Sequence, residues 1–119
     1  MVVDETRASY SDATKGCFGD GITGCALTDL VAVGSKPGGD GVWGQSDLSG
    51  NVWEWALDGY AATYADPCTD CANLTATTSR VVRGGSFGSD ASYLRAAYRD
   101  DLAPMIRADN RGVRCARAP

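Results

Sequence analysis

Residues 49–55, SGNVWEW, place one carboxylate between two tryptophans, directly after a Gly-Asn turn. Strand alternation gives one interpretation, in which Trp53 and Trp55 face a core and Glu54 faces water. A second interpretation gives Glu54 a cation as its partner. These seven residues leave both interpretations open.

The chain contains no histidine. Histidine is the usual general base near neutral pH and the commonest transition-metal ligand. A Ser-His-Asp triad, a Cys-His dyad and a histidine-ligated zinc or iron site are therefore excluded within this chain.

Five cysteines remain as candidates for covalent or metal chemistry. Four form two close pairs, CFGDGITGC (Cys17 and Cys25) and CTDC (Cys68 and Cys71), and Cys115 is left over. Four thiolates could bind zinc, but the first pair is spaced more widely than a usual zinc knuckle. The spacing favours two local disulfides in an exported protein, and Cys115 either pairs with a cysteine elsewhere or is a buried free thiol.

With 119 residues, the chain is one small domain or part of one. Its 11 basic and 15 acidic residues give a net charge of -4, which leaves no basic footprint for nucleic acid. No apolar run is long enough to span a membrane, and the first residues lack the apolar segment of a signal peptide. We therefore expect neither nucleic-acid binding nor membrane insertion.

The elements that must position these residues are short. No window shows sustained helical periodicity, so long amphipathic helices are not expected. The pattern predicts strands over 51–57, 80–83, 93–99 and 112–115, a brief helical turn at 47–50, an irregular excursion over 58–79 and a polar loop over 100–110. Short strands between long loops indicate an α+β domain whose function is carried by its loops.

Four stretches in this order, SGNVWEW, RVVRGGSF, LRAAYR and GVRCA, resemble the formylglycine-generating enzyme (sulfatase-modifying factor) family. The resemblance covers about residues 8–117. It implies the family's variant of the C-type-lectin-like fold, loop-rich with short antiparallel strands. It also implies that residues 1–119 are a single domain that matches the C-terminal portion of the family's domain and lacks its N-terminal portion.

The resemblance implies calcium as the cation beside Glu54. By position, the ligands would be the Asp47 side chain, the Gly50 and Val52 carbonyls and the Glu54 carboxylate. An all-oxygen set of this kind suits a hard divalent cation.

A looser mapping places another calcium site at Ser9, Tyr10, Asp20 and Ile22. Ser9 stands where the family usually has asparagine. A disulfide between the first two cysteines would hold the loop around Asp20 in shape before an ion binds.

Copper is the catalytic metal that the resemblance implies for the family's enzymes, held by two cysteines just after the GGS motif to oxidise a substrate cysteine. Those positions here read Ser89 and Leu94, and neither offers the soft thiolate that copper(I) prefers. The cysteine-oxidising activity is therefore not expected. A related branch uses non-haem iron, but its histidines are absent from this chain.

The loop after the GGS motif is where the family's pocket would open. Ser86 matches an active-site serine of the family, and Arg83 and Arg95 are expected to form structural ion pairs. The candidate ligand contacts are Ser86, Ser89, Asp90, Tyr93, Arg95 and Arg99.

Three functions follow as hypotheses. The first is a non-catalytic, calcium-stabilised recognition domain that binds a peptide, glycan or protein in an extracellular or periplasmic setting. The second is part of a formylglycine-generating-enzyme-like or non-haem-iron oxidoreductase, completed by a missing N-terminal half or a partner chain. The third is a structural or assembly subunit that self-associates.

Overall fold

The structure is a computed structural model that describes residues 4–12, 16–17, 19–69, 71–75 and 78–115. Loops dominate it, and the helical content of the described residues is two single-turn 3₁₀ helices, η1 (Leu27–Asp29) and η2 (Pro37–Gly39). The strands are β1 (Ser11–Asp12), β2 (Gly16–Cys17), β3 (Trp53–Gly59), β4 (Arg80–Arg83), β5 (Asp100–Leu102) and β6 (Arg111–Val113). The predicted loop-rich architecture with short strands is confirmed.

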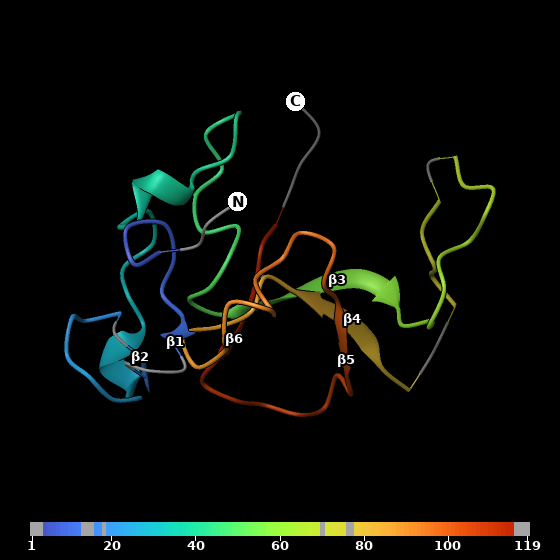
Figure 1. The fold of residues 1–119 in the computed structure, drawn as a ribbon. Helices are drawn as coiled ribbons and strands as arrows, with labels where there is room; N and C mark the ends of the chain where they lie inside the picture. The colour runs from blue at the N-terminus through green and yellow to red at the C-terminus, as the bar shows by residue number, and fades with distance from the viewer. Residues whose placement is uncertain (1–3, 13–15, 18, 70, 76–77, 116–119) are drawn as a thin grey trace.

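A four-stranded sheet in the order β5-β4-β3-β6 forms the centre of the molecule, and β1 pairs with β2 beside it (Figure 1). Strand β3 runs antiparallel to β4, with Glu54 opposite Arg83, and β4 runs antiparallel to β5. Strand β6 runs parallel to β3, with Trp55 opposite Val113. The sheet is therefore mixed, and the parallel pair brings the end of the chain against the WEW motif.

The prediction of a strand over 93–99 is wrong. These residues form successive turns, in which the Tyr93 amide donates to the Asp90 carbonyl at 3.1 Å and the Tyr98 amide donates to the Arg95 carbonyl at 2.8 Å. The neighbouring strand β5 instead occupies residues predicted as loop. The apolar alternation that suggested a strand has another cause. Leu94 lies in a turn, and its side chain packs into the core.

The predicted helical turn at 47–50 is also absent. Asp47 has φ 55° and Gly50 has φ 78°, and both values lie in the left-handed region, which cannot continue a right-handed helix. Gly50 is required here for a second reason. A Cβ on Gly50 would lie 2.3 Å from the Ser9 carbonyl oxygen, so the two segments can approach only without a side chain.

A small core lies where the N-terminal segment meets the loop of the GGS motif, residues 84–95, which we call the GGS loop. Ala8, Tyr10 and Leu94 form a buried cluster, and Tyr93 packs against it. Trp53 is buried as expected, with its ring 6.1 Å from the Tyr93 ring in an edge contact. Aromatic side chains at this junction therefore fix β3 against the loop that follows the GGS motif.

The β3–β4 loop (residues 60–79) extends from the end of β3, away from β1 and β2 (yellow-green in Figure 1). Asn73 anchors it, because its backbone carbonyl accepts from the Gly59 amide at 2.7 Å and its side chain donates to the Gly59 carbonyl at 2.9 Å.

Among the described residues, no helix is both long and apolar enough to cross a membrane.

Candidate functional site

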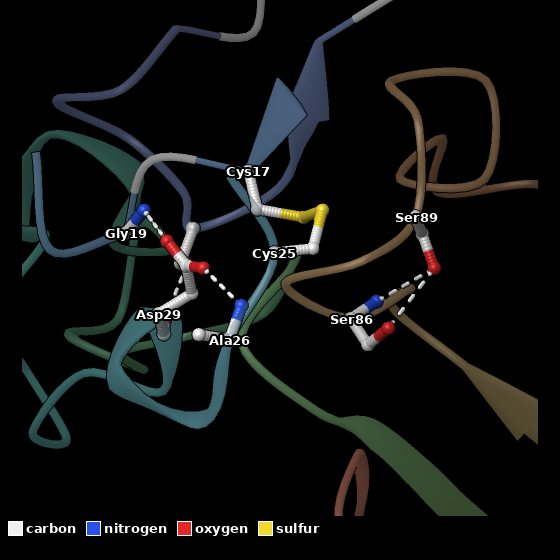
Figure 2. The surroundings of a disulfide bond; sticks show 8 residues. Cys17, Gly19, Cys25, Ala26, Asp29, Ser86 and Ser89 are labelled. Carbon is white, nitrogen blue, oxygen red and sulfur yellow. Dashed lines mark hydrogen bonds between the residues drawn. A yellow bond between two sulfur atoms is a disulfide. The ribbon is translucent and has the colours of Figure 1, made fainter. Parts of the chain in front are cut away.

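A disulfide joins Cys17 to Cys25, as predicted, and closes a loop over a buried acid (Figure 2). The acid is Asp29, which is only 2% exposed. One carboxylate oxygen accepts from the Gly19 amide at 2.7 Å, and the other accepts from the Ala26 amide at 2.9 Å. A buried carboxylate is tolerated where hydrogen bonds replace its hydration, and both oxygens of Asp29 meet that requirement.

Close backbone approach completes this corner of the molecule. The Ser9 hydroxyl donates to the Asp29 carbonyl at 2.7 Å. A Cβ at position 19 would lie 2.1 Å from that carbonyl oxygen and 2.3 Å from the Ser9 hydroxyl oxygen, so only glycine fits. Asp29 was not among the residues singled out from the sequence. Its signal was an acid three residues after Ala26, the spacing at which a side chain reaches back to a helix-starting amide.

The candidate ligands of the looser calcium site fall into two different environments. Ser9 and Tyr10 are buried, whereas Asp20 and Ile22 are exposed. The Asp20 carboxylate accepts from the Ile22 amide at 2.8 Å. Hydrogen bonds from the Thr28 hydroxyl and the Ile22 amide hold the pKa of Asp20 below its ordinary value. Asp20 is thus an exposed, ionised acid at the tip of the loop.

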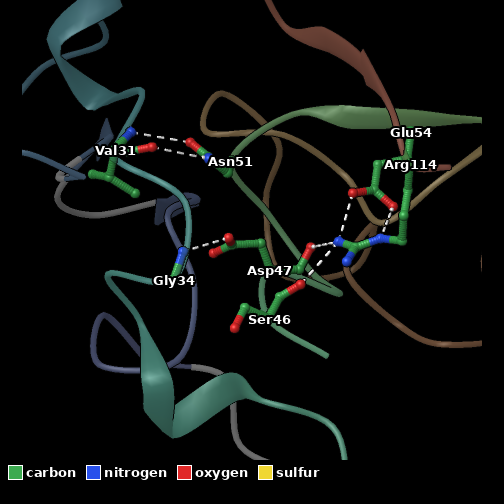
Figure 3. Close-up of polar contacts among 7 residues, drawn as sticks. All are labelled: Val31, Gly34, Ser46, Asp47, Asn51, Glu54 and Arg114. Carbon is green, nitrogen blue, oxygen red and sulfur yellow. Dashed lines mark hydrogen bonds and ion pairs between the residues drawn. The ribbon is translucent and has the colours of Figure 1, made fainter. Parts of the chain in front are cut away.

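The acid of the WEW motif has a cationic partner, the guanidinium of Arg114 (Figure 3). Arg114 Nη2 lies 2.7 Å from Glu54 Oε1, and Nε donates to Oε2 at 3.0 Å, a bidentate arrangement. The same Nη2 also donates to the backbone carbonyls of Ser46 at 2.9 Å and Asp47 at 3.1 Å. The hydrogen bond and charge of Glu54 raise the pKa of Arg114.

The predicted ligands around this point are only partly convergent. Asp47 contributes its backbone carbonyl, while its carboxylate turns the other way and accepts from the Gly34 amide at 2.8 Å (Figure 3). Gly50 lies in the same turn, and its amide donates to the Gly84 carbonyl at 2.7 Å. Val52 is half-buried and directly precedes β3.

Chemically, this spot selects for positive charge. Two backbone carbonyls and one carboxylate face a single guanidinium, and all the donors are hard oxygen. Within the part of the chain that the structure describes, no three Cys, Asp or Glu side chains gather closely enough to hold a metal ion. A cation here would therefore depend on backbone carbonyls as much as on acids.

Arg114 was missed from the sequence because its partner lies 60 residues earlier. The usable signal was the GVRCA stretch. Once β6 pairs in parallel with β3, Gly112 lies opposite Glu54, and the side chain of Arg114, two residues further on, reaches the carboxylate.

The GGS loop holds hydroxyl groups and an apolar side chain at the positions of interest. Ser86 is buried, and its hydroxyl lies 3.1 Å from that of Ser89, which also accepts from the Ser86 amide at 3.1 Å (Figure 2). Leu94 is 3% exposed and belongs to the core cluster. Positions 89 and 94 thus offer one hydroxyl, which already contacts Ser86, and no soft donor for copper(I).

The other candidate ligand contacts do not converge on one point. The Asp90 carboxylate accepts from the Ser92 amide, and Arg95 Nε donates to the Ser92 carbonyl, both at 2.8 Å. Tyr93 packs toward Trp53, whereas Arg99 stacks over the ring of Tyr64 in the β3–β4 loop. Arg99 therefore belongs to a different feature from the GGS loop.

The expected ion pairs of Arg83 and Arg95 are absent from the residues that the structure describes. Neither arginine pairs with a carboxylate in the described part of the chain, and both donate to backbone carbonyls instead. Cys115 has no disulfide partner within the described residues and is exposed, so of its two alternatives the buried thiol is wrong, while pairing with a cysteine elsewhere stays a prediction. The second predicted disulfide, Cys68–Cys71, is present, and both of its cysteines are exposed.

Comparison with known proteins defines the class. The family model described as "Sulfatase-modifying factor enzyme 1-like domain" matches residues 4–119, so the chain belongs to this family. A formylglycine-generating enzyme of Thermomonospora curvata is 36% identical over 108 residues, covering 84% of this chain and 33% of that protein. The enzyme of Streptomyces coelicolor is 37% identical over 86 residues, covering 68% and 26%, and the mouse enzyme is 33% identical over 101 residues, covering 82% and 25%.

A solved structure agrees on the fold. Treponema denticola variable protein 1 superimposes with a TM-score of 0.69 at 24% identity, over 91% of this chain and 34% of that one. This likeness supports the C-type-lectin-like fold of the family. The chain spans between a quarter and about a third of the length of the curated relatives it matches.

Proposed function

We propose that the chain is a non-catalytic recognition domain on the sulfatase-modifying-factor scaffold, stabilised by calcium and acting in an extracellular or periplasmic setting. The observation that carries the non-catalytic part is the environment of positions 89 and 94. The Ser89 hydroxyl hydrogen-bonds the Ser86 hydroxyl, and Leu94 is packed in the core. Copper(I) requires soft ligands that this pair does not supply.

The experiment for this part compares copper binding and oxygen consumption in the natural chain and in Ser89→Cys/Leu94→Cys. We expect the natural chain to bind no copper(I) in competition with a chromogenic chelator and to consume no oxygen with a thiol peptide. The double variant should gain copper(I) binding. Copper binding and oxygen consumption by the natural chain would instead favour the second function below.

Calcium is proposed for the oxygen cluster around Glu54. The candidate ligands are the Glu54 carboxylate, the Gly50 and Val52 carbonyls and Asp47. The support is that the Glu54 carboxylate and the Ser46 and Asp47 carbonyls already converge on one positive group there. Because that group is the guanidinium of Arg114, calcium and Arg114 would compete for the same carboxylate.

Thermal unfolding with and without calcium tests this competition. Calcium at a hundredfold excess over its Kd would stabilise the fold by about 2.7 kcal/mol. We expect this increase to vanish in Glu54→Gln and to grow in Arg114→Gln, while the exposed Glu5→Gln behaves as the natural chain does. Identical unfolding curves with and without calcium in both the natural chain and Arg114→Gln would contradict the calcium proposal.

The oxidising setting rests on the two disulfides, which persist mainly outside the reducing cytosol. The proposed ligand of the domain is a peptide, glycan or protein that binds at the GGS loop. The proposed contacts are Ser86, Ser89, Asp90, Tyr93 and Arg95.

A second candidate function is an oxidoreductase part completed by an N-terminal half or a partner chain. It is favoured by the names of the curated relatives, all formylglycine-generating enzymes, and by the partial coverage of their length. A third candidate, self-association, is favoured by exposed apolar side chains such as Val42 and Trp43, which are 94% and 87% exposed. Size measurement in solution tests the third.

A further inference from the structure

A cavity of about 640 Å³ lies between the β3–β4 loop and the sheet. It is separate from the GGS loop and from the oxygen cluster around Glu54. Its lining includes Asp58, Tyr64, Arg83 and Arg99, together with the Cys68–Cys71 disulfide. Cavities of a few hundred Å³ with mainly apolar walls and a few polar groups are typical of small-ligand sites.

Two guanidinium groups line this cavity without a carboxylate partner in the described part of the chain. Arg99 stacks 4.0 Å from the centroid of the Tyr64 ring and donates to the Ala62 carbonyl at 3.1 Å. Arg83 donates to the Tyr64 hydroxyl at 3.4 Å and to the Ala96 carbonyl. Each guanidinium carries five N–H donors, so both keep donors for a further partner.

Among the described residues that line the cavity, Asp58 is the single acid, and it does not neutralise both cations. Asp58 accepts from the Asn73 amide at 2.9 Å, a contact that ties its charge to the base of the loop. Among these described residues, two positive groups and one negative group leave a net positive charge, which a monoanion would complement. Planar guanidinium groups match the two oxygens of a carboxylate.

The remaining walls specify the body of the ligand. In the part of the lining that the structure describes, four alanine side chains and Val81 offer apolar contact. The Asn73 contacts to Gly59 hold the loop on the sheet before a ligand arrives, which lowers the ordering cost of binding. Tyr64 positions both arginines at once, through its hydroxyl and its ring.

We propose that this cavity is a binding site for a small organic monocarboxylate with an apolar body, whose carboxylate is held between Arg83 and Arg99. The site does not depend on calcium or on the GGS loop. Inorganic sulfate has no apolar body to occupy the alanine-lined part, so it is the weaker ligand.

The test is an amide-resonance titration of the folded chain with 4-phenylbutyrate, its neutral analogue 4-phenylbutyramide and inorganic sulfate. We expect the carboxylate to shift the amide resonances of Gly59, Ala61 and Thr63. The neutral amide should bind about tenfold more weakly or worse. Equal affinity for acid and amide, shifts confined to other residues, or no shifts at millimolar probe would each overturn the proposal. Tighter binding of sulfate would replace it with a simple oxyanion site.

Variants locate the carboxylate. Arg83→Lys and Arg99→Lys keep the charge but lose the planar fork, and each should weaken 4-phenylbutyrate by about tenfold. The exposed Arg107→Lys is the matched control and should bind as the natural chain does. Tyr64→Phe keeps the ring under Arg99 and removes the hydroxyl that Arg83 contacts, so it should weaken binding by a smaller factor. If either arginine variant fails to fold, the acid-amide comparison on the natural chain decides, and unchanged affinity in folded arginine variants would refute the assignment.

Discussion

Cys17–Cys25 and Cys68–Cys71 are both short-range disulfides, yet their surroundings differ. Cys17 is fully buried and Cys25 is exposed, and the loop that they close lies against the buried carboxylate of Asp29. Both Cys68 and Cys71 are exposed, and they border the cavity that holds Arg83 and Arg99.

The difference lies in where the polar groups find their partners. Beside the Cys17–Cys25 loop, the amides of Gly19 and Ala26 satisfy both oxygens of the buried acid Asp29. At the β3–β4 loop, Asn73 ties the base, while the guanidinium groups of Arg83 and Arg99 line a cavity. A disulfide can therefore complete a closed structural unit in one place and support an open binding wall in another.

The largest expected effect comes from removing each disulfide in turn. Cys17→Ala/Cys25→Ala should lower the free energy of unfolding by about 2–5 kcal/mol, the range for a native disulfide of a small domain. The Cys68–Cys71 disulfide closes a shorter, exposed loop, so Cys68→Ala/Cys71→Ala should lower the free energy of unfolding by about 2 kcal/mol at most. Urea unfolding measures both, and an equal or reversed order would break the contrast between the two loops.

The next effect tests whether the buried acid is the reason for the closed loop. Asp29→Asn replaces one of two acceptor oxygens with an NH₂ group facing a backbone amide, leaving two donors in conflict. We expect a loss of about 1–3 kcal/mol in the free energy of unfolding. Asp66→Asn, an exposed acid of the β3–β4 loop, is the matched control and should change little. A neutral result at Asp29 would mean that its hydrogen bonds do not stabilise the loop.

The same contrast explains what could be predicted from the sequence. Both disulfides were predictable because cysteine spacing is a local signal, and β4 was predicted at its observed bounds. The partner of Glu54 was not, because Arg114 reaches it only through the parallel pairing of β6 with β3. The cavity was not predicted either, because it forms only when the β3–β4 loop lies against its two strands and Arg99 joins them from beyond β4.

The strand predicted over 93–99 failed for a related reason. Leu94 and Tyr93 are placed by contacts with Ala8 and Trp53, which lie far away in the sequence. Their alternation matched a strand, but tertiary packing selected turns. The calcium ligands stay a prediction. The Asp47 carbonyl and the Glu54 carboxylate both accept from the guanidinium of Arg114, but the Asp47 carboxylate accepts from Gly34 instead.

The smallest expected effect concerns Asp90 in the GGS loop. This loop is tied to β1, because the Ser11 amide donates to the Ser89 carbonyl at 2.8 Å. Hydrogen bonds from the Ser92 hydroxyl and amide hold the pKa of Asp90 below its ordinary value of 3.8. A lowered acid pKa stabilises the fold above the ordinary value, and that stabilisation is lost as pH falls through the folded value. Ser92→Ala removes the hydroxyl, so the pKa of Asp90, followed by carboxyl NMR titration, should rise toward 3.8. Ser35→Ala is the control and should leave it unchanged. An unchanged pKa of Asp90 in Ser92→Ala would show that the backbone amide alone sets it. The GGS loop would then not share with the Cys17–Cys25 region the hydrogen bonding that holds an acid in place.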